Sequence, residues 1–121
     1  MSQEEFYNLD DMSQGIARTL AEGLETRIFP GDHAMLSVVR CAPNSSGKLH
    51  SHPQEQWGVL LEGGGTRLQS GREIEVRKGD FWRTPGDVEH GFRAGPQGAV
   101  ILDIFAPPRE EYRKPGSGFG A

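Results

Sequence analysis

Short apolar stretches separated by turn residues follow one another along most of the chain. β-forming residues dominate at 34–41 and 99–108, and an apolar run at 56–63 ends in consecutive glycines. A shorter candidate strand occupies 48–52 and stops at a proline, which cannot donate a backbone hydrogen bond to a ladder. Turn signals recur about every 8–12 residues, a spacing typical of a β-sandwich or barrel. The pattern therefore predicts an all-β domain of about eight short strands.

The two ends of the chain depart from this pattern. We expect an N-terminal arm at 1–22, a barrel at 23–112 and a tail at 113–121 that is either flexible or wraps a partner subunit. Within this region the segment 16–24 is ambiguous. Its propensities permit a short helix, but the segment is brief and glycines bracket it.

Composition and charge exclude several classes of function. Of the 121 residues, 35% are hydrophobic and 25% charged, and the net charge of −4 comes without the basic block that nucleic-acid binders carry. No run approaches the roughly 20 apolar residues of a membrane span, and no basic-then-apolar leader is visible. We therefore expect a cytoplasmic protein with no nucleic-acid or membrane partner. The single cysteine, Cys41, excludes an internal disulfide and a zinc cluster built from thiolates.

Two histidines one residue apart, His50 and His52, raise the question of a metal site. Side chains at i and i+2 of a strand point to the same face, so the two imidazoles can converge on one point. The chain then turns and re-enters a strand, which brings Glu55 or Gln56 back toward them, and His90 follows a Pro-Gly turn. An isolated pair of this spacing fits a polar strand face equally well, so the metal hypothesis depends on the additional residues.

The spacing of these residues resembles the two sequence motifs of the cupins. The first motif is matched by His50, His52, Gln56 and Gly63, and the second by Gly79, Pro85 and His90. The family usually has glutamate where Gln56 stands, and Asp87 and Ala94 replace a usual glycine and asparagine of the second motif. The resemblance, to small single-domain cupins of the RmlC-like type, implies a conical jelly-roll barrel.

By this resemblance the metal ligands are His50, His52, Gln56 and His90. Three neutral imidazoles and an oxygen donor suit a divalent transition metal, namely Zn²⁺, Ni²⁺, Fe²⁺ or Mn²⁺. Because Gln56 contributes a dipole and no charge, the ion would keep its full +2 charge and act as a stronger Lewis acid toward an anionic substrate. Glu55 is the rival for the fourth ligand, and a metal-free polar network is the alternative for the whole cluster. His33 matches no motif, and we expect it in a solvated loop.

A second group of polar residues lies in the apolar segment 99–108 and just after it. Asp103 and Phe105 share a strand face, and Arg109 follows two prolines that stiffen the chain. If that face lines the barrel interior, Asp103 is a buried carboxylate, which must be paired or functional. The alternatives are an edge or capping role for Asp103, a core position for Phe105, and a surface ion pair with a following glutamate for Arg109.

The run D-x-F-x-P-x-R-E-E, from Asp103 to Glu111, is similar to small cupins of pectin and alginate breakdown. The resemblance implies an enzyme that converts 4,5-unsaturated monouronates to open-chain keto acids. It assigns Asp103 to proton transfer, Arg109 to binding of the sugar carboxylate and Phe105 to packing against the ring. The alternatives are a metal-dependent dioxygenase or epimerase, or a non-catalytic cupin that binds a small molecule.

The partners expected from the resemblance are a sugar-acid substrate and a second copy of the chain. Small cupins commonly form homodimers, and a long apolar strand at 99–105 suits a buried or intersubunit position. Trp57 and Trp82 fit either the barrel wall or such an interface.

Overall fold

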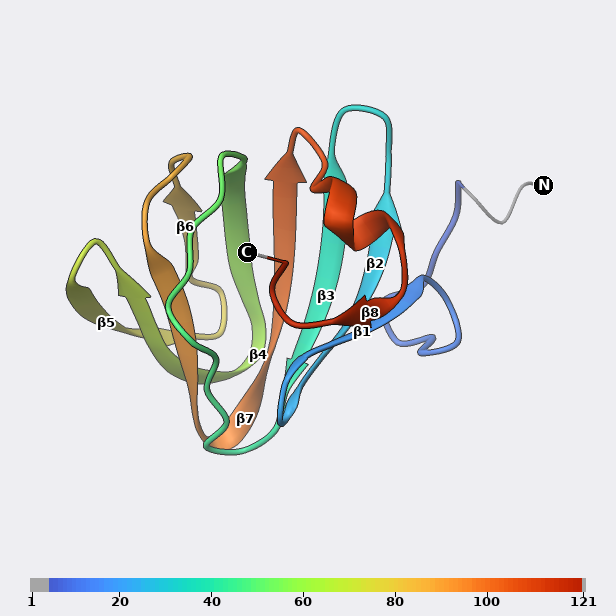
Figure 1. Ribbon diagram of the computed structural model, residues 1–121. Coiled ribbons are helices and arrows are strands. Elements are labelled where there is room, and N and C mark those ends of the chain that lie inside the picture. Colours follow the sequence, from blue (N-terminus) through green and yellow to red (C-terminus); the bar gives the residue numbers. More distant parts are fainter. Residues whose placement is uncertain (1–4, 121) are drawn as a thin grey trace.

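The computed structural model describes residues 5–120, which form an all-β structure (Figure 1). Its strands are β1 (Ile16–Ala21), β2 (Leu24–Pro30), β3 (Met35–Cys41), β4 (Glu55–Gln69), β5 (Arg72–Arg77), β6 (Phe81–Thr84), β7 (His90–Ala106) and β8 (Gly116–Ser117). One short 3₁₀ helix, η1 (Glu110–Arg113), precedes β8. The all-β jelly-roll architecture expected from the sequence is confirmed.

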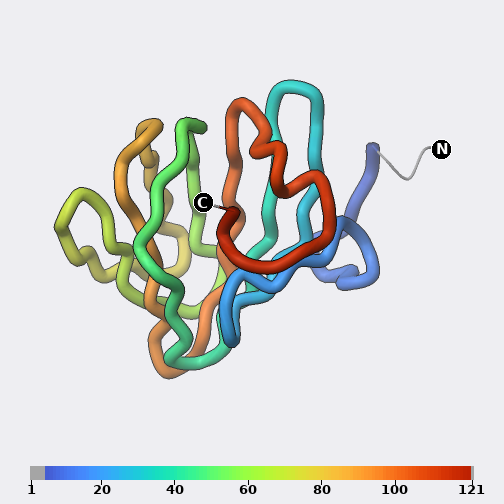
Figure 2. The backbone as a smooth tube through the Cα atoms, viewed as in Figure 1, coloured from blue at the N-terminus to red at the C-terminus, as the bar shows by residue number. Residues whose placement is uncertain are grey.

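The strands belong to one curved sheet, in the order β5-β4-β7-β3-β2-β1-β8, and β6 pairs with the first part of β4. All pairings are antiparallel except that of β1 with β8. In Figures 1 and 2 the sheet narrows toward one end, and the last part of the chain crosses in front of it. The curved sheet forms a cup, and η1 and β8 lie in front of it.

Two strands are much longer than the pattern of turn residues predicts. The glycine run was expected to end a strand at residue 63, but β4 continues through it and pairs with β7 along almost its whole length. The register shifts between Leu60 and Glu62 and again between Gly63 and Gly65, so the glycines bend the strand without ending it. Gly63 has φ +79°, and a Cβ there would clash with the Gly98 carbonyl oxygen. The bend thus depends on the missing side chain.

The expected strand at 48–52 is wrong. This segment makes one isolated bridge, His50 with His90, and a second bridge joins Ser46 to Arg93 just before it. The backbones of His50 and His90 exchange two hydrogen bonds, of 3.0 and 2.9 Å, and the ladder does not extend further toward Pro53, which has no N–H to donate. The bridge nevertheless fixes the two histidines beside one another.

The ambiguous segment near the start of the chain forms a strand. β1 pairs with β2 from Ile16–Ile28 to Ala21–Leu24, and a turn at Gly23 joins the two strands. The range 1–22, expected as an arm, therefore contributes a strand to the sheet, and the tail contributes β8 through its pairing with β1. The pairing with β2 decides between strand and helix here, and the helix and strand propensities of the segment itself contain no information about that pairing.

The apolar core lies between the walls of the cup. Its most deeply buried members come from all the long strands and η1, and include Ile28, Met35, Leu60, Ile101, Phe105 and Tyr112. Trp57 is 40% exposed and Trp82 packs against the core, so only the first presents a large indole surface to the outside. Among the described residues, none of the helices has the length and apolarity needed to cross a bilayer.

Candidate metal centre and the cavity around it

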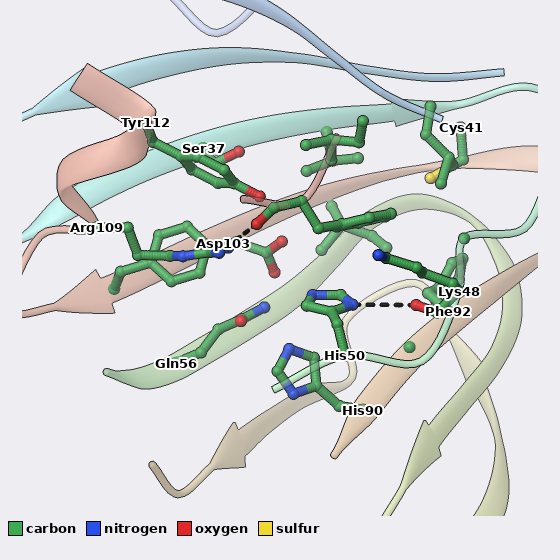
Figure 3. Close-up of a pocket in the computed structure, with 18 of the residues that line it drawn as sticks. Ser37, Cys41, Lys48, His50, Gln56, His90, Phe92, Asp103, Arg109 and Tyr112 are labelled. Carbon is green, nitrogen blue, oxygen red and sulfur yellow. Dashed lines mark hydrogen bonds between the residues drawn. The ribbon is translucent and has the colours of Figure 1, made fainter. Parts of the chain in front are cut away.

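Three histidines meet inside the cup. His50 and His52 come from the extended segment before β4, and His90 is the first residue of β7. One ring nitrogen from each lies within 4.8 Å of the others, and His52 and His90 are almost fully buried. Figure 3 shows His50, His90 and Gln56 facing the same space. The convergence predicted for the three histidines is confirmed.

Each imidazole is oriented by a backbone carbonyl two residues away. The Nδ1 atoms of His50, His52 and His90 lie 3.0, 3.1 and 2.9 Å from the carbonyl oxygens of Lys48, Gln54 and Val88. A carbonyl oxygen can only accept a hydrogen bond, so each Nδ1 carries the hydrogen and each Nε2 keeps its lone pair. The backbone thus fixes the tautomer in which three Nε2 lone pairs remain available as ligands.

Gln56 completes the donor set. Its Oε1 lies 3.0 Å from His52 Nε2, which places two acceptor atoms at hydrogen-bond distance. Two neighbouring ligands of one ion, each about 2.1 Å from it at a right angle, would stand about 3 Å apart. His90 Nε2 is buried with no hydrogen-bond partner. Four donors of this kind fit a divalent ion. In a metal-free site the Gln56 amide would instead be rotated so that its NH₂ group donates to His52 Nε2, and His90 Nε2 would remain without a partner.

Burial keeps the histidines neutral. It lowers the pKa of His50 to about 4 and that of His90 to about 3, and it lowers the pKa of His52 as well. The charge of Arg109 adds to the effect at His50 and His52. Neutral imidazoles are the form that binds a metal.

Glu55, the rival fourth ligand, lies outside the cluster. Its carboxylate accepts a hydrogen bond of 2.7 Å from Arg83 Nε and a longer one from Trp57 Nε1. This surface pair uses both oxygens, which leaves Gln56 as the oxygen donor that faces the histidines. His33, expected in a solvated loop, is exposed.

Asp103 and Phe105 of β7 face the same cavity. Asp103 pairs with Gly58 and Phe105 with Gln56 in the register of β4 and β7. Asp103 Oδ1 is buried and has no hydrogen-bond partner, and burial raises the pKa of this carboxyl to about 6 against the opposing charge of Arg67. The Phe105 ring packs edge-on against the His52 ring, with 5.6 Å between centroids.

Arg109 is the largest fully buried side chain, with 1% of its surface exposed. Its guanidinium stacks over the Tyr112 ring at 4.1 Å, and its Nε lies 3.5 Å from a carboxylate oxygen of Glu111. Its Nη2 donates to the backbone carbonyl of Phe119 in the tail. The three residues that sequence analysis grouped as Asp103, Phe105 and Arg109 thus line one cavity with His50, His90 and Gln56 (Figure 3).

The tail covers part of this cavity. The Phe119 ring stacks on the His50 ring with 4.2 Å between centroids and 29° between planes. Arg18 holds the tail backbone by donating to the carbonyls of Gly118 and Ser117 at 2.8 and 2.9 Å. The space left inside is about 50 Å³, room for a few water molecules.

Comparison with known proteins identifies the family. The family model described as a cupin domain matches residues 37–105. This chain is a cupin. It is 36% identical over 89 residues to the dimethylsulfoniopropionate lyase DddW of Ruegeria pomeroyi, an alignment that covers 74% of this chain and 57% of that protein.

Solved structures share this cupin's fold at low sequence identity. An RmlC-like cupin from Shewanella frigidimarina matches with a TM-score of 0.76 and 22% identity over 88% of this chain and 96% of its own. KdgF from a Halomonas species matches with a TM-score of 0.75 and 20% identity over 83% and 94%. Oxalate decarboxylase of Bacillus subtilis, an enzyme with Mn(II) centres, matches with a TM-score of 0.72 and 20% identity over 91% of this chain and 33% of its own.

Several residues of the cavity were not singled out from the sequence, and two of them, Arg67 and Phe119, make contacts that shape the site. Arg67, in the second half of β4, is 5% exposed and lines the cavity of this cupin. Phe119 lies in the tail and stacks on His50. The available signals were weak: a basic residue beside apolar ones in a strand, and an aromatic residue in a glycine-rich end. Neither belongs to a motif, and both positions depend on contacts between distant segments.

Proposed function

We propose that this cupin is a metal-dependent enzyme that converts 4,5-unsaturated monouronates to open-chain keto acids. The observation that supports the proposal best is the joint placement of Asp103 and Arg109 in one cavity with the histidine cluster. A buried carboxyl group, a buried guanidinium and a set of metal donors are the groups that proton transfer on a sugar acid needs. The run from Asp103 to Glu111 supports the same substrate class by its resemblance to cupins of pectin and alginate breakdown.

The residues that would hold the metal are His50, His52 and His90 through Nε2 and Gln56 through Oε1. All four are neutral, so the charge of a bound divalent ion would remain uncompensated by its ligands. Nitrogen and oxygen donors suit Zn²⁺, Ni²⁺, Fe²⁺ or Mn²⁺. A divalent ion bound there supplies Lewis-acid polarisation of a substrate oxygen.

Asp103 is the group that would move the proton. Opening of the ring breaks the bond between the anomeric carbon and the ring oxygen, and it transfers one hydrogen from the anomeric hydroxyl to the ring carbon at the double bond. No other reactant is needed, because substrate and product are isomers. A carboxyl group with a pKa of about 6 can accept the hydroxyl proton and return it to carbon near neutral pH. Asp103 Oδ1 has no hydrogen-bond partner, so it is free to accept a hydrogen bond from the anomeric hydroxyl.

Arg109 and Phe105 would orient the sugar. Arg109 now donates to the Phe119 carbonyl, a neutral acceptor that a carboxylate can replace with two stronger, charge-assisted hydrogen bonds. The stacking of its guanidinium on Tyr112 restricts the direction from which the carboxylate can approach. The Phe105 ring, edge-on to His52, offers an apolar surface on the adjoining wall.

The proposal is tested by adding an unsaturated monouronate to the purified protein and following the loss of its ultraviolet absorbance. Elemental analysis of the same sample measures bound metal, and His90→Ala serves as the control that removes a ligand. Rapid loss of absorbance that requires metal and Asp103 supports the proposal. Bound metal without loss of absorbance would reject this substrate while retaining the metal centre.

A second candidate function follows from the sequence identity with the lyase DddW. A dimethylsulfoniopropionate lyase acts on a molecule with a sulfonium cation as well as a carboxylate. The buried guanidinium groups of Arg67 and Arg109 make the cavity unfavourable for that cation, because like charges repel strongly in a medium of low polarity. Release of dimethyl sulfide from dimethylsulfoniopropionate by the same metal-loaded protein would favour this candidate over the first.

A further inference from the structure

Arg67 is a buried cation that the proposed reaction does not use. Only 5% of it is exposed, and within residues 5–120 no carboxylate oxygen lies within ion-pair distance of its guanidinium. Arg109, by contrast, has Glu111 beside it. Burial lowers the pKa of Arg67 only to about 10, so the side chain is charged at neutral pH. Asp103 is the carboxyl group whose charge acts on Arg67, but no ion pair joins the two side chains. A ligand anion in contact with Arg67 would supply the close counter-charge that a buried guanidinium needs.

The guanidinium is held in place by neutral groups. Its Nη2 donates to Thr84 Oγ1 at 2.7 Å and its Nε donates to Gln69 Oε1 at 3.2 Å, while Thr84 Oγ1 donates to the same Gln69 oxygen at 2.8 Å. The Trp82 ring lies 5.3 Å from the guanidinium carbon. These contacts fix the orientation of Arg67 and leave its charge unpaired. Among the described residues, none accepts a hydrogen bond from Nη1.

Arg67 lies at the wall of the ligand cavity, so the positive charge of its guanidinium acts on whatever binds there. It pairs with Phe92 in the register of β4 and β7, and it lines the same cavity as His90 and Asp103. The cavity is lined by two guanidinium groups, the Lys48 side chain and a single carboxyl group, and a metal ion held by neutral ligands would add further positive charge. The excess of positive charge favours a ligand with negatively charged or oxygen-bearing groups at more than one position.

We propose that Arg67 is a second anion-binding residue of this cavity, so that the ligand is gripped at two separate points. The ligand class that fits is a sugar acid with a carboxylate at one arginine and a second oxygen group at the other, and an acid with a carboxylate at both ends binds most tightly. Assigning the first carboxylate to Arg109 rests on the proposed function. The role of Arg67 rests on its own burial and unpaired charge.

The test is calorimetric binding of three saturated probes to the metal-loaded protein. Galactarate has two carboxylates, galacturonate has one, and galactose has none. The wild-type protein is expected to bind them in that order. Arg67→Met is expected to weaken galactarate binding by about ten- to a hundred-fold, the effect of losing a charge-assisted hydrogen bond, and to abolish the preference for galactarate over galacturonate. Arg67→Lys keeps the charge and is expected to retain part of the preference.

Metal content and thermal unfolding of each variant are measured alongside. A wild-type protein without preference for galactarate, or a folded, metal-loaded Arg67→Met protein that keeps it, would overturn the proposal. Failure of both Arg67 variants to fold would overturn it too, because the guanidinium would then be a structural element. A preserved galactarate preference with no turnover of unsaturated monouronates would reject the proposed function and leave the role of Arg67 intact.

Discussion

Replacement of Phe119 by alanine is expected to make the cavity easier to reach. In the closed arrangement the Phe119 ring covers His50, the Phe119 carbonyl takes a hydrogen bond from Arg109, and only about 50 Å³ remains inside. A sugar acid is larger than the few water molecules that fit this space, so we expect the tail to move away when a sugar acid binds. The apparent dissociation constant is then the intrinsic one divided by the fraction of open molecules.

The size of the effect follows from the contact that the substitution removes. A stacked aromatic pair contributes about 0.5–1.5 kcal/mol beyond its buried area, which changes the ratio of open to closed molecules by about two- to twelve-fold. Phe119→Ala is therefore expected to lower the dissociation constant of galacturonate by about that factor, provided that most molecules are closed. Arg18 still holds the backbone of Gly118 and Ser117 in this variant, so closure is weakened and not abolished.

Isothermal titration of the metal-loaded protein measures this change directly. Phe81→Ala is a matched control, because Phe81 is 70% exposed and does not line the cavity. The control should bind galacturonate as the wild-type protein does. Weaker binding by Phe119→Ala would show that the ring belongs to the ligand-binding surface, and unchanged binding would show that the tail does not restrict access; either result refutes the reasoning.

Four further predictions concern the centre and the barrel. His90→Ala is expected to lose most of its bound metal in elemental analysis, because one of three imidazole donors is removed. Asp103→Asn is expected to keep its metal and lose about 10²- to 10⁴-fold in turnover, and full activity would exclude Asp103 from proton transfer. Cys41 is buried, and burial raises the pKa of its thiol to about 12, so alkylation at pH 8 should be slow in the native protein and fast in urea. Gly63→Ala should lower the free energy of unfolding in urea by about 1–3 kcal/mol, and by more than Gly71→Ala, which has the same backbone strain but open space around the new methyl group.

The sequence contained enough to predict the class of the fold and the convergence of the histidines, because both depend on local spacing. Turn residues at regular intervals indicated many strands, and the positions of His50, His52 and His90 matched known motifs. Strand lengths were less predictable. The glycines at 63–65 look like a strand end in sequence, yet they bend β4 while its ladder with β7 continues. Whether glycines end a strand or bend it is decided by the partner strand, which a local pattern does not include.

Arg67 and Phe119 could not be assigned for a related reason. Gln69 is close to Arg67 in the sequence, but nothing there shows that Thr84 will also hold it without neutralising it, since the contact with Thr84 joins β4 to β6. In the same way, the stacking of Phe119 on His50 joins positions 69 residues apart, and the tail alone gives no indication of it. Residues of this kind become visible only when burial and missing partners are examined together.

The charge distribution connects these residues to the neutral ligand at position 56. A glutamate in place of Gln56 would add a negative charge beside His52 and lower the positive potential of the cavity. With glutamine there, the metal charge, Arg67 and Arg109 all act on the ligand, and Asp103 is the single carboxyl group that lines the space with them. Gln56→Glu should therefore bind the metal more tightly and galacturonate more weakly, and a variant in which both affinities rise would contradict this electrostatic account. The same substitution should leave the fold unchanged, because the two side chains have the same shape and the Gln56 position faces the cavity.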